Sequence, residues 1–424
     1  MQVSALKHFW PGIAEGAKLK NAVKWLGCST LSCSRRSVLA GAIALSLSQL
    51  VAGCQSSNGG KLTVKFLKDA VPAPMLGEFR RRLEAGVRIE LSSVSRLSEL
   101  FELLVRAKAV SQEETAEEPS RSLPFFQRRT TPDVPDLALI GDYWLPKAIS
   151  SELIRPLTPQ AWTHWDELPQ SPIAWQSLVT RSETTGDRVW AAPYRWGSTV
   201  IAYNVEKFDA LGWTPTDWSD LWRSELQGRI ALLDSPRQTI GLVLKKLGRS
   251  YNLVDLASVT DLEPELRSLH AQTRLYSSTA YQQPLQMGDV WAAVGSSRDI
   301  LAMPQYGKQI AAVVPKSGTS LWADLWVRPA NAETSNAQIT KAVDRWIDFC
   351  WDVRIARQLS LLTFAASPAL FAEKRTDLPQ SLQDNDVLFP DTEILQRSEF
   401  IEPFTDEGAI EQYRTLWVRL RSGG

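Results

Sequence analysis

The sequence predicts an α/β fold, and three observations lead to that prediction. From Lys61 onward, short apolar strands alternate with segments of helical length and pattern. The apolar run at 136–142 ends in Gly-Asp, and ligands of open α/β sheets collect at such strand ends. In 337–351 the apolar residues recur at helical spacing. Together these features indicate helices on a largely parallel sheet.

Composition excludes several classes of protein. The chain has 424 residues, 44% of them apolar, with 47 basic and 47 acidic residues. This length allows two or three domains with a core in each. Zero net charge argues against a nucleic-acid-binding protein, which needs a basic face, and the apolar content argues against disorder. The 4 cysteines cannot form a disulfide scaffold, and no Cys or His pairs lie at zinc-ligand spacing. The 17 tryptophans suit packed lobes or a stacking surface.

The N-terminal segment 1–53 predicts an export signal. It has six basic residues against one acid, a net charge of +5, which leaves −5 for the rest of the chain. Arg35-Arg36 indicates a twin-arginine signal, and the uncharged stretch 38–52 after it is too short for a confident membrane span. Val-Ala-Gly-Cys resembles the lipobox of bacterial lipoproteins, so we expect cleavage before Cys54, lipid on its thiol, a tether at 54–60 and a periplasmic, membrane-anchored product. An uncleaved anchor or a soluble periplasmic product remains the alternative.

The first part of the mature chain alternates strands and helices. The expected elements are a strand at 62–66, a helix entered near Pro72 or Pro74, a strand at 87–91 and a helix from about 95 to 110. Acidic residues and prolines then interrupt the pattern, and we interpret 111–135 as a solvated insertion loop. The strand at 136–142 resumes the sheet.

The second part continues the alternation and contains the longest expected strand, 192–204. A capped short helix at 215–222, a strand from 228 and a helix at 239–247 closed by Gly248 come next. The remaining expected elements are strands at 290–297, 310–315 and 318–327 and the helix at 337–351. Cys350 is the one cysteine after Cys54, and we expect it buried in that last helix.

Several motifs give the chain a family resemblance. They are Pro193-Tyr194-Arg195-Trp196-Gly197, Trp218-Ser219-Asp220-Leu221-Trp222, Leu233-Asp234-Ser235-Pro236-Arg237, Gly288-Asp289-Val290, Pro315-Lys316-Ser317-Gly318 and Trp322-Ala323-Asp324. In order and spacing the chain resembles the periplasmic substrate-binding proteins of ABC importers, specifically the spermidine/putrescine-binding group, from about Leu62 to Arg419.

The resemblance implies two α/β lobes joined by a hinge of crossing strands, with a ligand cleft between the lobes. The first lobe would comprise 61–196 and about 325–370, and the second 197–324 and about 371–424. Crossings are expected near 194–197, near 322–325 and after the helices of 337–360. Arg195 and Trp196 would lie at the hinge.

The same resemblance implies a set of ligand-binding positions. Trp322 and Asp324 match a stacking tryptophan and an amine-binding aspartate on one face of a strand, and Tyr143 matches a pocket tyrosine. Other positions depart from the family: Ser235 and Gln238 replace two carboxylates beside Asp234, and Ser296 replaces a second tryptophan. The remaining candidates are Asp299 and Phe364, the latter roughly in place of a tyrosine.

The implied function is capture of a polyamine, whose charges need carboxylates and whose methylenes need aromatic walls. Partners would be an ABC permease and its ATPase, with a monomeric receptor and no cofactor or metal. Because acids are lost and Lys68 and Arg298 are gained relative to the family, a different small solute, such as a zwitterion, remains an alternative ligand. A lipid-anchored scaffold that has lost ligand binding is another alternative. Trp322 could instead pack the hinge, Asp324 could pair with Arg195 or Arg298, and Arg195 could position the hinge.

An enzyme is not expected. Nucleophile-elbow, P-loop and metalloprotease motifs are absent from the sequence. A Ser-His-Asp site would have to use His164 or His270, the two histidines after the leader, and neither lies in a motif.

Overall fold

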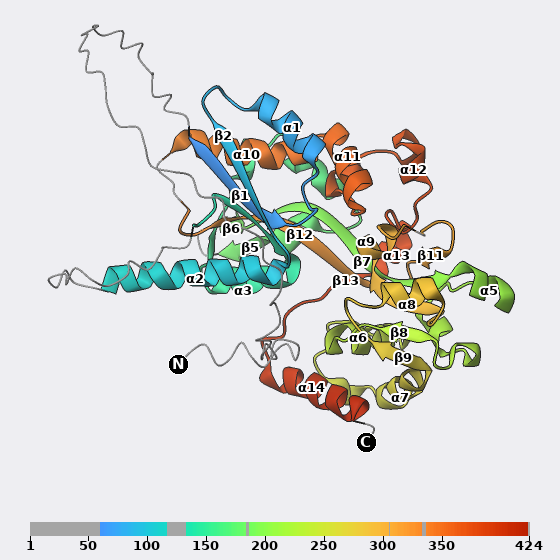
Figure 1. Ribbon diagram of the computed structural model, residues 1–424. Coiled ribbons are helices and arrows are strands. Elements are labelled where there is room, and N and C mark those ends of the chain that lie inside the picture. The colour runs from blue at the N-terminus through green and yellow to red at the C-terminus, as the bar shows by residue number, and fades with distance from the viewer. Residues whose placement is uncertain (1–59, 117–132, 184–185, 305, 333–335, 423–424) are drawn as a thin grey trace, which may run out of the picture. The chain divides into compact units, whose positions relative to one another are not determined.

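The structure, a computed structural model, describes residues 60–424 except 117–132, 184–185, 305, 333–335 and 423–424 (Figure 1). All described helices and strands belong to one compact unit, residues 56–424. The expected leader 1–53, Cys54 and all but the last residue of the tether lie outside the described residues. No helix within the described ranges is both long enough and apolar enough to cross a membrane.

Within the described residues, eleven strands form one sheet. Its main path runs β2-β1-β3-β12-β7-β10-β8-β9, with β11 beside β7 and with β4 and β13 beside β12. Their bounds are β1 Lys61–Leu67, β2 Arg88–Val94, β3 Leu137–Gly141, β4 Ile154–Arg155, β7 Ala192–Asn204, β8 Ile230–Leu232, β9 Thr273–Tyr276, β10 Ala292–Ser296, β11 Ile310–Val313, β12 Ser320–Pro329 and β13 Glu399–Phe400. Strands β5 Thr180–Glu183 and β6 Gly186–Val189 form a separate hairpin.

Helices connect and cover these strands. Their bounds are α1 Ala73–Arg82, α2 Leu97–Ala116, α3 Leu145–Ser150, α4 Trp175–Val179, α5 Val205–Leu211, α6 Pro236–Lys246, α7 Leu262–Gln272, α8 Gln282–Met287, α9 Ser297–Leu301, α10 Ala337–Trp351, α11 Val353–Thr363, α12 Gln380–Gln383, α13 Thr392–Arg397 and α14 Glu407–Arg421. Short 3₁₀ segments include η2 Asp142–Trp144, η5 Trp218–Trp222 and η8 Pro368–Ala372.

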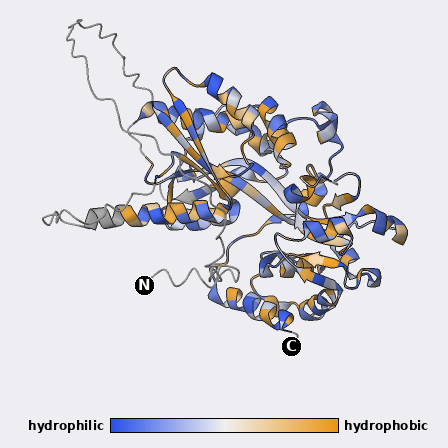
Figure 2. Cartoon of the chain, in the orientation of Figure 1, coloured by the Kyte–Doolittle hydropathy of each residue, from blue (hydrophilic) through white to orange (hydrophobic). Residues whose placement is uncertain are grey.

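The core lies along the central strands. Every residue of β3 is buried, and β1 alternates between buried and more exposed positions, as a strand covered mainly on one face should. Helix α10 contacts β1 and β7, and α2 contacts β1, β2 and β3. Figure 2 shows the same division, with apolar residues concentrated in the strands and both kinds of residue alternating along α2. Cys350 is fully buried in α10, as expected.

Strand β7 links two groups of strands. Its first half pairs with β12, and its second half pairs with β10 and β11 (Figure 1). A third connection follows α11, where the backbone groups of Trp196 and Ala366 exchange two hydrogen bonds of 2.9 Å. These pairings lie where the sequence placed the crossings, while the exact lobe boundaries stay a prediction.

Two expectations need correction. The sheet is mixed rather than largely parallel, because β7 and β12 run antiparallel to the neighbours that they pair with in the middle of the sheet. Helix α2 continues to Ala116, so the first six residues of the expected loop 111–135 are helical. Gln112 and the glutamates after it are good helix formers, which explains the extension. Residues 117–132 lie outside the described residues.

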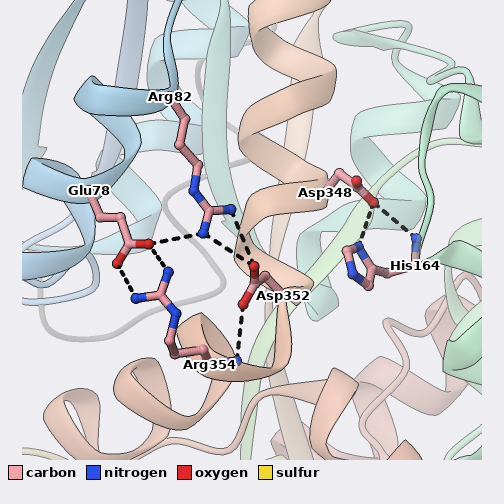
Figure 3. A network of polar contacts seen from close by, with 6 residues as sticks. All are labelled: Glu78, Arg82, His164, Asp348, Asp352 and Arg354. Carbon is pink, nitrogen blue, oxygen red and sulfur yellow. Dashed lines mark hydrogen bonds and ion pairs between the residues drawn. The ribbon is translucent and has the colours of Figure 1, made fainter.

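A polar network ties α11 to α1 (Figure 3). Glu78 of α1 accepts hydrogen bonds from Arg82, at 2.9 Å, and from both terminal nitrogens of Arg354. Arg82 also donates to Asp352, whose other oxygen caps α11 through the Arg354 amide. Because these side chains are partly exposed, the network orients the helices more than it stabilises the fold.

Candidate functional site

The candidate site is built where β7 and β12 lie side by side. In the antiparallel register Trp322 faces Gly197 and Asp324 faces Arg195. Residues two apart on a strand share a face, so Trp322 and Asp324 lie on the same side as Arg195 and Gly197. The register shifts immediately after Asp324, so the ladder is irregular at the edge of this group.

Arg195 and Asp324 form a buried ion pair. Arg195 Nε donates to Asp324 Oδ2 at 2.7 Å, and the side chains are 0% and 3% exposed. The sequence left Asp324 as an amine-binding residue or as the ion-pair partner of Arg195 or Arg298, and the structure shows the ion pair with Arg195. The two remaining nitrogens of the guanidinium, Nη1 and Nη2, are buried and have no hydrogen-bond partner among the described residues.

Gly197 allows the Trp322 ring to lie against β7. A Cβ atom at this glycine would be 2.5 Å from Trp322 Cζ2 and 2.5 Å from Ser297 Oγ, closer than real contacts permit. The Ser297 hydroxyl accepts a hydrogen bond of 3.1 Å from the Ser198 amide and so joins α9 to β7. Trp322 is partly exposed, but its Nε1 is buried and unpartnered within the described chain.

A second carboxylate, Asp142, lies beside Asp324. It stands at the end of β3, in η2, and its Oδ1 accepts a hydrogen bond of 2.8 Å from the Ala323 amide. Burial raises the pKa of Asp142 to about 7, and the negative charge of Asp324 adds to this effect. Asp142 was not among the residues predicted from the sequence, although the Gly-Asp end of a buried strand was a signal for it.

Tyr143, which was predicted as a pocket residue, comes directly after Asp142 in the sequence. Tyr143 is partly buried in η2, with its ring 5.7 Å from that of Trp144, and burial raises its pKa. Helix η2 contacts β12, so Tyr143, Trp322 and Asp324 come from adjoining elements, and their role as ligand-binding residues stays a prediction.

Helix α6 brings Gln238 to the same region. The Ser320 hydroxyl lies 2.7 Å from Gln238 Oε1 and 2.8 Å from the Thr199 hydroxyl. Ser320 is two residues from Trp322 on β12, and Thr199 is two residues from Gly197 on β7, so both lie on the strand face that carries the candidate site. Ser235 caps α6 by accepting from the Gln238 amide, so its hydroxyl is already engaged.

Asp234 points elsewhere: it forms an ion pair of 2.7 Å with Arg421 of α14, and both side chains are substantially exposed. No described contact joins it to Trp322 or Asp324.

The end of β10 and the start of α9 supply the remaining polar candidates. Ser296 pairs in register with Thr199. Burial lowers the pKa of Arg298, and the positive charge of Arg195 lowers it further, while Asp299 and Asp324 oppose the change. Burial likewise raises the pKa of Asp299. Arg298 is thus within electrostatic reach of the buried pair, and its guanidinium has no ion-pair partner in the described part of the chain.

Phe364 lies apart from this group by every contact described. It ends α11 in a left-handed conformation with φ 54° and is 39% exposed. Two residues later Ala366 pairs with Trp196, so Phe364 is near the third crossing.

In the described ranges, the side chains that could bind a metal ion do not gather into a cluster. Those ranges contain no group of three or more His, Cys, Asp or Glu side chains able to hold a metal ion. His164 Nδ1 lies 2.9 Å from Asp348 Oδ1 (Figure 3), and His270 Nδ1 lies 2.9 Å from the Tyr276 hydroxyl.

Comparisons with known proteins give the family. Residues 132–398, more than half of the chain, match the family described as bacterial extracellular solute-binding protein. The spermidine/putrescine-binding periplasmic protein of Salmonella typhimurium is 23% identical over 390 residues, which cover 92% of this chain and 99% of that protein. The protein of the same name from Escherichia coli is 26% identical over 289 residues, covering 68% of this chain and 78% of the relative.

A solved structure supports the fold. The spermidine/putrescine ABC transporter substrate-binding protein PotD from Streptococcus pneumoniae superposes with a TM-score of 0.70 at 21% identity, over 86% of this chain and 99% of that one. The expected two-lobed architecture is thereby confirmed, and so is the family resemblance. Such proteins are transport receptors that bind a small molecule and deliver it to a permease. The chain belongs to the bacterial extracellular solute-binding proteins.

Proposed function

We propose that this chain is the receptor of an ABC importer that captures a polyamine of the spermidine/putrescine class between its lobes and delivers it to a permease and its ATPase. The names of its relatives support this choice, because spermidine/putrescine-binding proteins match most of the chain. We propose further that the receptor acts as a monomer.

The observation that carries the proposal is the pair of neighbouring carboxylates beside an aromatic ring. Asp142 and Asp324 lie close enough for the charge of one to raise the pKa of the other. An alkylammonium group would relieve this repulsion. Trp322, on the same strand face as Asp324, offers a ring for the methylenes or the cation.

Export and anchoring complete the proposal. Arg35-Arg36 would direct the chain to twin-arginine export, and Cys54 would carry the lipid. The Cys54→Ser variant should then move from the membrane fraction to the soluble periplasmic fraction. Unchanged fractionation would contradict the anchor.

Ligand-dependent stability tests the cargo. Spermidine or putrescine at 100 times its Kd should stabilise the purified full-length chain by about 2.7 kcal/mol, measured as a rise in melting temperature. Asp142→Asn should reduce the rise. Asp348→Asn, which removes a carboxylate bound to His164, should leave it unchanged. No rise with any polyamine at millimolar concentration would refute the cargo and leave the family unchanged.

A further inference from the structure

Arg195 has more hydrogen-bonding capacity than its surroundings use. The residue is 1% exposed, and its Nε is occupied by Asp324. Nη1 and Nη2 are buried without a partner among the described residues. Buried donors are nearly always paired in folded proteins, because an unpaired one loses its hydration without return. Two free donors on one guanidinium form the end-on fork that binds a carboxylate with two parallel hydrogen bonds.

A further hydrogen-bond donor and a second cation come from residues near Arg195. Trp322, two residues from Asp324 on the same strand face, has a buried Nε1 that is unpartnered within the described residues. Arg298, at the start of α9, is close enough to Arg195 for their charges to repel, and it forms no ion pair with a described side chain. An anion placed between the two arginines would relieve that repulsion.

The site therefore offers both signs of charge. Asp142 can receive an ammonium group, and the guanidinium groups of Arg195 and Arg298 lie close enough for their charges to interact. A simple polyamine, which carries only ammonium groups, would leave the Arg195 fork unused and bring further positive charge beside it. A molecule with a carboxylate at one end and an ammonium group at the other would satisfy both halves.

We propose that Arg195 is an anion-binding residue of the cargo site, and that the cargo is an amine that also bears a carboxylate. Its carboxylate binds Nη1 and Nη2 of Arg195 beside the Trp322 N–H, and its ammonium group binds near Asp142. Opening of the lobes, the usual motion of two-lobed receptors, admits the ligand to this enclosed face. The inference rests on the proposed role of an amine receptor of an ABC importer and replaces the simple polyamine with an amine that also bears a carboxylate.

Calorimetric titration of the full-length chain with five-carbon probes tests it. The probes are 5-aminopentanoate, pentane-1,5-diamine, pentylamine and pentanoate. 5-Aminopentanoate should bind at least tenfold more tightly than pentylamine and than the diamine, a difference of about 1.4 kcal/mol or more. Equal binding of pentylamine and 5-aminopentanoate would overturn the inference.

A matched pair of variants locates the effect. Arg195→Lys keeps a positive charge opposite Asp324 but removes the fork, so the preference for 5-aminopentanoate over pentylamine should disappear in this variant. Arg421→Lys, at a surface ion pair with Asp234, should change nothing. Retention of the full preference in Arg195→Lys would contradict the inference. If that variant does not fold, Arg298→Gln, at a partly exposed position, should still reduce the preference for 5-aminopentanoate over pentylamine.

The probes also separate this inference from the proposed function. Tighter binding of the diamine or spermidine than of 5-aminopentanoate would refute the carboxylate and support polyamine capture. Binding of 5-aminopentanoate alone would support the inference and replace the polyamine. Binding of pentanoate without any amine would retain the Arg195 site and refute an amine receptor, and no binding at all would refute both.

Discussion

Removing either charge of the buried ion pair between Arg195 and Asp324 should strongly reduce the free energy of unfolding. Asp324→Asn keeps the shape of the side chain but leaves the buried guanidinium without a counter-ion. Both side chains are at most 3% exposed, so water cannot take the place of the lost charge. Breaking such a pair by removing one partner costs about 3–5 kcal/mol. We therefore expect Asp324→Asn to lower the free energy of unfolding by an amount in that range.

A double-mutant cycle with urea unfolding at pH 7.5 measures the interaction. Arg195→Met alone should lower the free energy of unfolding as much as Asp324→Asn, because it leaves the buried Asp324 carboxylate without a counter-ion. Arg195→Met combined with Asp324→Leu removes both charges, and such apolar replacements are often neutral or stabilising. Glu90→Gln, which breaks a surface ion pair with Lys61 whose side chains are more than half exposed, should have no measurable effect. A loss below about 1 kcal/mol for Asp324→Asn would refute the reasoning.

Three further substitutions probe the surrounding structure. The folded chain keeps a proton on Asp142 up to about pH 7, which the unfolded chain releases near pH 4, so this group makes stability fall as the pH rises between those values. Asp142→Asn should remove that slope and raise the unfolding free energy at pH 8 by at most about 4 kcal/mol; an unchanged slope would contradict the raised pKa. Gly197→Ala should displace the Trp322 ring and weaken ligand binding at least tenfold in calorimetry, because the new Cβ would lie 2.5 Å from that ring. Gly241→Ala places a Cβ 2.0 Å from the Tyr251 ring and should cost about 1–3 kcal/mol in urea unfolding without changing ligand preference; a smaller loss would mean that the ring moves freely.

Local signals made much of the fold predictable. Asp217 caps η5, and Gly248 follows α6 in a left-handed conformation with φ 71°, as their positions in the sequence indicated. Propensity failed at the end of α2, because the acidic stretch after Val110 suits a loop and a solvated helix equally well. The antiparallel central pairs were also missed, since strand direction depends on long-range pairing rather than on local pattern.

The site was predictable only along each strand. Alternation placed Trp322 and Asp324 on one face, and the structure agrees. Which residue of β7 stands opposite Asp324 depends on a register between segments more than a hundred residues apart, with an irregularity beside the pair. For that reason the sequence left the Arg195–Asp324 pair among several alternatives. It also gave no means of knowing that Asp142 would reach the amide of Ala323.

A ligand ammonium group and the guanidinium of Arg195 would compete for the carboxylate of Asp324. Arg195 already holds one oxygen of Asp324 at 2.7 Å, so an ammonium group that bound the same oxygen would have to displace a buried guanidinium. Asp142 is more available to accept a hydrogen bond from an ammonium group, because the hydrogen bond described for its side chain comes from the neutral Ala323 amide. Burial raises the pKa of Asp142, so its negative charge is unfavourable there unless a cation lies beside it. We therefore expect Asp142 to hold the amine, while Asp324 holds the guanidinium of Arg195, whose remaining donors would bind the opposite end of the ligand.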